Sequence, residues 1–382
     1  MTPGFAPLQV FRDVAVVPVQ SVVQHVAVGG PIWTDFDQQV TARHCRDRKP
    51  VDTCPAAPAQ VDALAQTALW GGFLNPQFGH LIVEQLTRLP QSLAERPGDR
   101  VLFTLPRGAT VSSVPDWVWQ ALAWHGVSRE RAWLVDRPLA AAELRVAAQG
   151  EMMGRDVTGE AYLDLLDRNP QRAALVPDPA QVVFVTRAGL VERGQGGHAG
   201  ESYLADALRL AGVRVVDPAR LSVSQQLAIY AGARVLVFSE GSAIHGRLLL
   251  GRIAQHIHVL RRRPHRDLAA EQLAPRCDAL TYHAAVGRRL GARKPGGVNR
   301  LDLTAAIYDL DVVLDLFARL GHDPSRHWDT TAYDAAVARD LTGWLSSCKT
   351  DADQHLANLD LIRQAGFQIG TPFKSSLRAR AL

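Results

Sequence analysis

The chain has 382 residues, of which 47% are hydrophobic and 21% are charged, and its formal net charge is +4 at pH 7. This is the composition of an ordinary globular protein, and the length predicts two domains. The sequence has no run of 18 apolar residues and no segment that concentrates basic charge. We therefore expect no transmembrane segment and no nucleic-acid partner.

The N-terminus and the cysteines predict the location of the protein. The first residues lack the basic and then apolar pattern of a signal peptide. Cys45, Cys54, Cys277 and Cys348 are too few and too scattered for a disulfide framework. We expect a cytoplasmic protein with reduced thiols. A homodimer and a peripheral contact with a membrane both stay open.

The N-terminal half begins with short valine-rich runs, which predict strands. A Gly/Asn/Pro loop then leads into residues 79–89, where His80, Glu84 and Arg88 step by four along one face of a predicted helix. A neutral imidazole at the start of a helix is suited to take a proton from a hydroxyl group. A helix-capping pair without chemistry explains His80 and Glu84 equally well.

Two units of strand, helix and strand follow, at residues 101–136 and 182–217. The second continues, so that residues 180–263 predict the order β-α-β-α-β-α-β. We expect an α/β protein with two Rossmann-type domains that face a cleft, at residues 1–175 and 176–290. Residues 287–300 are predicted to be a loop, and residues 301–367 largely helical, within a C-terminal extension at residues 291–382.

Residues 234–250 predict a ligand site at the edge of the second sheet. The strand Val235–Phe238 breaks at a Ser-Glu-Gly-Ser turn and is followed by an apolar helical run. Free backbone N–H groups at such a turn attract phosphates. Glu240 and His245 flank the turn. Arg187 and Arg193 follow the neighbouring strand, and their planar guanidinium groups suit a diphosphate.

Two other motifs point to different chemistry. Gly194–Ala199 fits G-x-G-x-x-[G/A], with Asp217 about 20 residues further on, which would indicate a nicotinamide-dependent oxidoreductase. The loop begins seven residues after the strand, however, and a dinucleotide fingerprint begins directly at the strand end. Asp-x-Asp occurs at residues 35–37, 309–311 and 351–353, outside the 180–263 stretch, so we expect surface carboxylates and no metal site.

Together these segments resemble glycosyltransferase family 61. Residues 79–89 are similar to its Gly-His-Phe-Leu-x-Glu-x-Leu-x-Arg-Leu run, and residues 240–245 to its Glu-Gly-Ser-Ala-x-His segment. Arg187, Arg193 and Glu201 stand where the family has two arginines and an Asn-Glu pair. Residues 221–233 are similar to its Leu-Ser-x-x-Glu-Gln-Ile-x-x-Phe-x-x-Ala helix. Gly200 replaces the usual Asn, and Gln225 the usual Glu.

The resemblance implies a GT-B fold and an inverting transferase with no cofactor and no obligatory metal, of the bacterial type used for capsular or other surface polysaccharides. Its substrates would be a nucleotide-sugar donor and a carbohydrate or other hydroxyl acceptor. A catalytically silent sugar-nucleotide-binding protein is a further alternative. The expected catalytic residues are His80, Glu84 and Glu240, and the expected donor-binding residues are Arg187, Arg193, Gly241, Ser242, His245 and Gln226.

Overall fold

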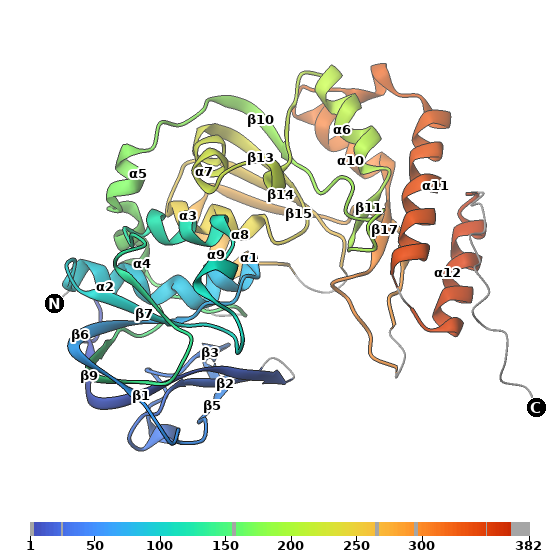
Figure 1. Ribbon diagram of the computed structural model, residues 1–382. Helices are drawn as coiled ribbons and strands as arrows, with labels where there is room; N and C mark the ends of the chain where they lie inside the picture. The colour runs from blue at the N-terminus through green and yellow to red at the C-terminus, as the bar shows by residue number, and fades with distance from the viewer. Residues whose placement is uncertain are drawn as a thin grey trace, which may run out of the picture.

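The computed structural model describes residues 4–23, 26–154, 158–263, 267–293, 297–348 and 350–367. It is a mixed α/β structure with two large sheets and a smaller third one (Figure 1). Helices α1, α3 and α8 lie between the two large sheets. No helix in the described part of the chain is long and apolar enough to cross a membrane.

The N-terminal sheet is mixed, in the order β5-β2-β1-β9-β6-β7-β8. The pairs β9·β6, β6·β7, β7·β8 and β2·β5 are parallel, whereas β1 runs antiparallel to both β2 and β9. Its strands are β1 (Gln9–Val23), β2 (Val26–Pro31), β5 (Asp52–Thr53), β6 (Asp62–Phe73), β7 (Arg100–Thr104), β8 (Ala132–Val135) and β9 (Leu139–Val146).

This sheet differs from the Rossmann arrangement that its strand-helix-strand unit suggested, because it curls on itself. The backbone N–H of Val19 on β1 donates to the carbonyl of Leu105, directly after β7, at 2.9 Å. The carbonyl of Val19 accepts from the N–H of Arg107 at 2.6 Å. The curl places β1 and β2 across the carboxyl ends of β6 and β7. A small hairpin, β3 (Cys45–Arg46) and β4 (Lys49–Pro50), also belongs to this half.

The main helical segments of the N-terminal half follow in chain order. They are α1 (Phe78–His80), a π-helical turn (Leu81–Gln85), a 3-10 turn (Leu86–Arg88), α2 (Leu89–Glu95), α3 (Asp116–Trp124), α4 (Glu160–Asp167) and α5 (Pro170–Ala174). The predicted helix at residues 79–89 is therefore present, but it is not a regular α-helix. π-turns of this kind are frequent at functional sites.

The second sheet is fully parallel, in the order β12-β10-β13-β14-β15. This is the flavodoxin-like 2-1-3-4-5 order, and it confirms the alternation predicted for residues 180–263. Its strands are β10 (Ala180–Val185), β12 (Arg214–Val216), β13 (Ala233–Ser239), β14 (His256–Leu260) and β15 (Ala279–His283). Its helices are α6 (Glu201–Leu210), α7 (Val223–Gly232), α8 (Ile244–Arg247), α9 (Ala270–Leu273) and α10 (Leu310–Arg319).

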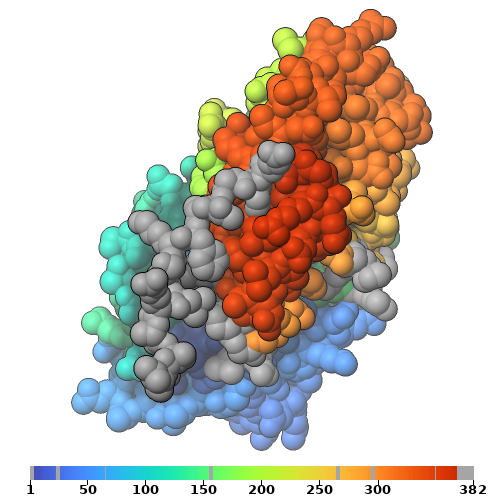
Figure 2. Space-filling view, turned by 90° about the vertical axis from the view of Figure 1, so that its right-hand side faces the viewer, coloured from blue at the N-terminus to red at the C-terminus, as the bar shows by residue number. Residues whose placement is uncertain are grey.

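The C-terminal region also contains strands that were not expected. β11 (Gly197–Ala199), β16 (Val286–Leu290) and β17 (Ala305–Tyr308) form a three-stranded sheet that packs on α11 (Thr330–Ser347), with α12 (Ala352–Gln364) beyond it. β16 has the sequence Val-Gly-Arg-Arg-Leu, which is a poor strand pattern, and it forms by antiparallel pairing with β17. Figure 2 shows the C-terminal helices, in orange and red, above the blue N-terminal half.

One hydrophobic core is continuous across both halves. It joins residues of β6, β7 and α3 to residues of β10, β13, α7 and α8. The indole N–H of Trp124 donates to the carbonyl of Leu249 at 3.1 Å. Glu151 and Arg276, both fully buried, form an ion pair at 2.9 Å between the halves. The two halves are thus packed against one another.

Candidate active site

The switch point of the parallel sheet lies between β10 and β13, because the connections that follow these two strands run in opposite directions. In open α/β sheets of this kind, ligands bind outside the carboxyl ends of the strands at that point. A cavity of about 430 Å³ lies there and is called the sheet-edge cavity below. Its lining includes Arg187, Arg193, Asp217, Gln226 and Ser242, and the aromatic pair Phe78 and Trp117. Four of the six residues predicted to bind a donor therefore meet in one cavity.

Arg187 lies across the turn that follows β13. Its Nη2 donates to the carbonyl of Gly196 at 2.9 Å. A Cβ on Gly241 would lie 2.0 Å from its Nη1, so a glycine is needed at this position for the guanidinium group to lie against the turn. Burial lowers the pKa of Arg187, and the nearby carboxylate of Glu201 opposes that shift. The guanidinium Nε is buried and has no partner among the described residues.

The region around the turn carries excess positive charge. Arg187, Arg262 and Arg263 interact electrostatically around Glu240. Glu201 supplies a second carboxyl group. Burial raises its pKa, although four groups donate hydrogen bonds to it. Three arginines thus face two carboxyl groups, and at the cavity itself exposed Arg193 adds a fourth cation and Asp217 a third carboxyl group. An anion bound there would balance the charge.

Glu240 faces inward. It is 1% exposed, and its Oε2 accepts from the backbone N–H groups of Arg262 and Arg263 at 2.6 and 2.9 Å. Its Oε1 accepts from Arg263 Nε at 2.6 Å. The carboxylate therefore holds the segment after β14 against the turn. Its expected catalytic role stays a prediction.

The helix after the turn is shorter than expected. α8 has four residues and continues as a 3-10 turn, so its dipole adds little to anion binding. His245 lies in this helix and is 3% exposed. Burial, followed by the charges of His80 and Arg263, lowers its pKa to about 4, so it is neutral at pH 7. A Cβ on Gly79 would lie 2.7 Å from His245 Cδ2, and α1 therefore touches the turn region directly.

On the other side of this contact, His80 and Glu84 form the expected i,i+4 pair. Glu84 Oε2 lies 3.0 Å from His80 Nδ1, and Glu84 is 2% exposed. Burial alone would raise the pKa of Glu84, but hydrogen bonds from His44, His80 and Arg46 outweigh it and hold the pKa far below its usual range. Glu84 is thus an ionised acceptor. It orients His80 so that Nε2 is available to act as a base.

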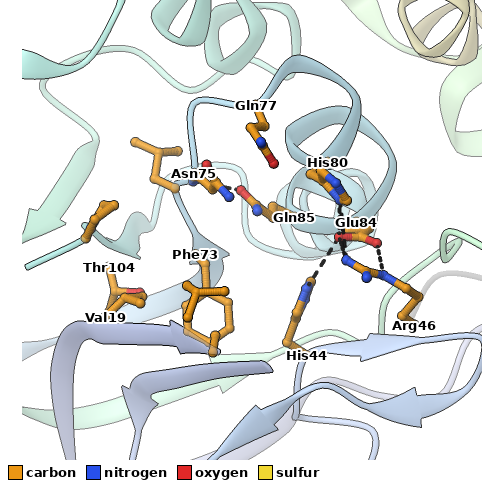
Figure 3. Close-up of a pocket in the computed structure, with 14 residues that line it drawn as sticks. Val19, His44, Arg46, Phe73, Asn75, Gln77, His80, Glu84, Gln85 and Thr104 are labelled. Carbon is orange, nitrogen blue, oxygen red and sulfur yellow. Dashed lines mark hydrogen bonds and ion pairs between the residues drawn. The ribbon is translucent and has the colours of Figure 1, made fainter. Parts of the chain in front are cut away.

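Two partners of Glu84 were not identified as functional from the sequence. Arg46, on β3, donates to both oxygens of Glu84 at 2.6 and 3.0 Å, and His44 Nε2 lies 3.7 Å from Oε2 (Figure 3). They come from a hairpin more than thirty residues earlier in the chain. No local sequence pattern signals this contact, apart from the incomplete metal-like run from His44-Cys45 to Cys54.

A second cavity, of about 200 Å³, lies beside His80 and is called the helix-start cavity below. Asn75 and Gln77 line it, whereas Pro76 and Phe78 line the sheet-edge cavity. Residues 75–80 therefore form a shared wall between the two cavities. Each cavity lies at the carboxyl ends of the parallel strands of its own half.

Other parts of the chain occupy the space beside the glycine-rich loop. A Cβ on Gly194 would lie 2.8 Å from the backbone of Ser347, and one on Gly196 would lie 2.2 Å from the carbonyl of Asp302. Gly197–Ala199 forms β11. The loop therefore packs under the C-terminal region and leaves no close approach for a pyrophosphate, which disfavours the oxidoreductase alternative.

The two departures from the family pattern have structural explanations. Gly200 has φ +78°, a backbone region that Gly and Asn both tolerate, and a Cβ there would lie 2.6 Å from Val337 on α11. Gln225 forms a reciprocal capping box with Ser222 at the start of α7. Among the described residues no group of three or more His, Cys, Asp and Glu side chains could hold a metal ion.

Comparison with known proteins finds one family model that matches part of the chain. Residues 78–252 match the family model of Glycosyltransferase 61. The matched segment is less than half of the chain, and it contains His80, Glu84, Arg187, Glu240 and His245. His44 and Arg46 lie outside it.

Two other comparisons add little. No curated protein matches the chain. The crystal structure of the flavodiiron protein from Giardia intestinalis is 12% identical, with a TM-score of 0.22, over 51% of this chain and 44% of that one. The chain spans less than half the length of that protein, and at this similarity the comparison carries no argument.

Proposed function

We propose that the protein is a glycosyltransferase that moves a sugar from a nucleotide-diphosphate donor to a hydroxyl acceptor. One observation carries the proposal: an arginine-lined cavity at a sheet switch point adjoins an oriented His-Glu pair across the Gly79–His245 contact. The match to Glycosyltransferase 61 supports the same reaction class. We place the donor on residues 176–290 and the acceptor on residues 1–175, in a GT-B-like arrangement, with residues 291–382 as an extension.

The donor diphosphate binds at the sheet-edge cavity. Arg187 and Arg193 contact its oxygens, and Gly241 and Ser242 form the adjoining turn. Gln226 faces the nucleoside part: its Nε2 donates to the carbonyls of Pro218 and Leu221 at 2.9 and 3.2 Å, which leaves Oε1 as an acceptor. His245 stabilises the turn. The arginines stabilise the charge of the leaving diphosphate, which is the task a metal ion performs in other transferases.

His80 is the general base, and Glu84 is a positioning residue. The acceptor oxygen attacks the anomeric carbon as the bond from that carbon to the phosphate oxygen breaks. The hydroxyl proton passes to His80 Nε2, and the nucleoside diphosphate leaves on the opposite side. A single displacement of this kind inverts the anomeric centre. We propose a cytoplasmic role in the synthesis of a surface polysaccharide or other glycoconjugate.

The test is a thermal-shift panel of nucleoside diphosphates, nucleotide sugars and NADH, followed by transfer and donor-hydrolysis assays with EDTA present. A diphosphate at about 100 times its Kd stabilises the fold by roughly 2.7 kcal/mol. We expect stabilisation by diphosphates and activity in EDTA. Restoration of a chelated, inactive enzyme by Mn²⁺ would contradict metal independence. Donor binding without hydrolysis or transfer would favour the silent binding protein, and stabilisation by NADH alone would favour the oxidoreductase.

A further inference from the structure

The described residues that line the helix-start cavity carry no uncommitted charge. Among its described lining residues the ionisable side chains are His44, Arg46, His80 and Glu84. Arg46 and Glu84 form a two-point ion pair, and both histidines lie against the same carboxylate. A carboxylate on a ligand would therefore meet only a guanidinium group that is already paired, and an ammonium group would meet only a carboxylate that is already paired. Such a ligand would also lose hydration without a partner.

Three neutral amide groups supply hydrogen-bonding capacity instead. Gln85 Oε1 accepts from the backbone N–H of Asn75 at 2.9 Å, and this bond fixes the direction of its amide. Gln85 Nε2 and the side-chain amides of Asn75 and Gln77 bond to no other described residue. Figure 3 shows all three at the cavity, together with Phe73. Amides both donate and accept, as hydroxyl groups require.

The rest of the lining is mostly apolar, although Thr104 also contributes a hydroxyl group. Val19, Leu74 and Pro106 line the cavity together with Phe73, which is 6% exposed. Edge contacts with His44 and Trp70, at centroid distances of 5.3 and 6.2 Å, hold the Phe73 ring. A ligand with one apolar face and a rim of hydroxyl groups would match both parts of the lining. At about 200 Å³ the cavity is smaller than the roughly 300–1,000 Å³ of pockets that enclose drug-sized ligands.

We propose that the helix-start cavity binds one uncharged sugar ring of the acceptor, with the C–H face of the ring on Phe73 and its hydroxyl groups on Asn75, Gln77 and Gln85. This inference rests on the proposed function and names its acceptor class. Phe73, Asn75 and Gln77 lie outside residues 78–252, so the acceptor wall is built largely by a part of the chain that the family model does not match.

The experiment compares three acceptors that differ in one group: a methyl glucoside, the matching glucuronide and the matching 2-amino-2-deoxyglucoside. They are assayed with the full chain and the donor that the thermal-shift panel identifies. We expect kcat/KM to be at least tenfold higher for the glucoside than for either charged analogue. A preference for the glucuronide or the amino sugar would overturn the inference.

Variants locate the site. We expect Gln77→Met to raise the acceptor KM tenfold or more, whereas Gln171→Met, which removes an exposed amide on α5, leaves KM unchanged. An unchanged KM in Gln77→Met would overturn the inference. Donor hydrolysis by the wild type without acceptor separates a failure of this inference from a failure of the proposed function. If hydrolysis occurs and the acceptor results fail, only this inference fails, and if no donor is bound or hydrolysed, both fail.

Discussion

We expect donor binding to depend most on Arg187, because this side chain is partly buried, lies across the turn after β13 and has a buried Nε without a partner among the described residues. We expect Arg187→Ala to weaken nucleoside diphosphate binding by about 2 kcal/mol, the scale of a charge-assisted hydrogen bond. Isothermal titration of the purified variant measures the loss. Arg214→Ala, which removes a partly exposed arginine paired with Asp178, is the control and should bind normally. Equal affinities in all three proteins would exclude this role for Arg187.

His80 and Glu240 are the two rival bases, and the structure separates them by environment. Glu240 accepts three hydrogen bonds, whereas His80 Nε2 bonds to no described residue. We expect His80→Ala to bind donor normally and to lose roughly a hundredfold or more in turnover, the usual contribution of a general base. Donor affinity and turnover are measured separately in His80→Ala and Glu240→Gln. The assignment is wrong if only Glu240→Gln shows that pattern.

At the scale of elements, the Glu84 cluster joins the β3 hairpin to the helix start. The pKa of folded Glu84 is depressed below the unfolded value of about 4.3. Its stabilisation is therefore present above about pH 4.3 and is lost as the pH falls through the folded pKa. We expect the difference in unfolding free energy between the wild type and Glu84→Gln to narrow from pH 6 to pH 3. Urea titrations measure it, and Asp116→Asn, which removes an exposed carboxylate, should give a nearly constant difference.

A second prediction at this scale concerns the contact between α1 and α8. A Cβ on Gly79 would lie 2.7 Å from the buried ring of His245, and overpacking of this kind costs about 1–3 kcal/mol. We expect Gly79→Ala to be destabilised by that amount and Gly79→Ala/His245→Ala to recover part of it. Gly98→Ala, where no atom lies within 4 Å of the added Cβ, is the control. Additive effects in this double-mutant cycle would show that the contact is not tight.

These elements also show what a sequence can predict. The four-residue step of His80 and Glu84 and the alternation of residues 180–263 are local patterns, and both are present in the structure. The curl of β1 over β7, the pairing of β16 with β17 and the approach of Arg46 to Glu84 depend on contacts between distant segments. Such pairing is decided by tertiary packing and leaves little local pattern. The gathering of Arg187 and Arg193 at the sheet edge was therefore predictable, whereas the lining of the helix-start cavity was not.

At the scale of the whole molecule, the two halves share one core. Domains that merely touch are expected to move independently, but a large apolar interface removes that freedom. The sheet-edge cavity and the helix-start cavity therefore belong to a single packed body. We therefore expect local movements, and not a wide opening of the two halves, during turnover.

The shared core predicts that the halves unfold together. Glu151 and Arg276 are 2% and 0% exposed at the side chain, and Thr158 bonds to both. Removal of one partner leaves the other charge buried and unpaired, which costs about 3–5 kcal/mol. We expect Glu151→Ala to lower the midpoint of one unfolding transition that both halves share. Asp164→Ala, which removes an exposed partner of Arg252, is the control and should cost about 1 kcal/mol or less. Hydrogen exchange followed separately in β6 and β13 distinguishes the outcomes, because independent domains would lose protection in only one half or at two different denaturant concentrations.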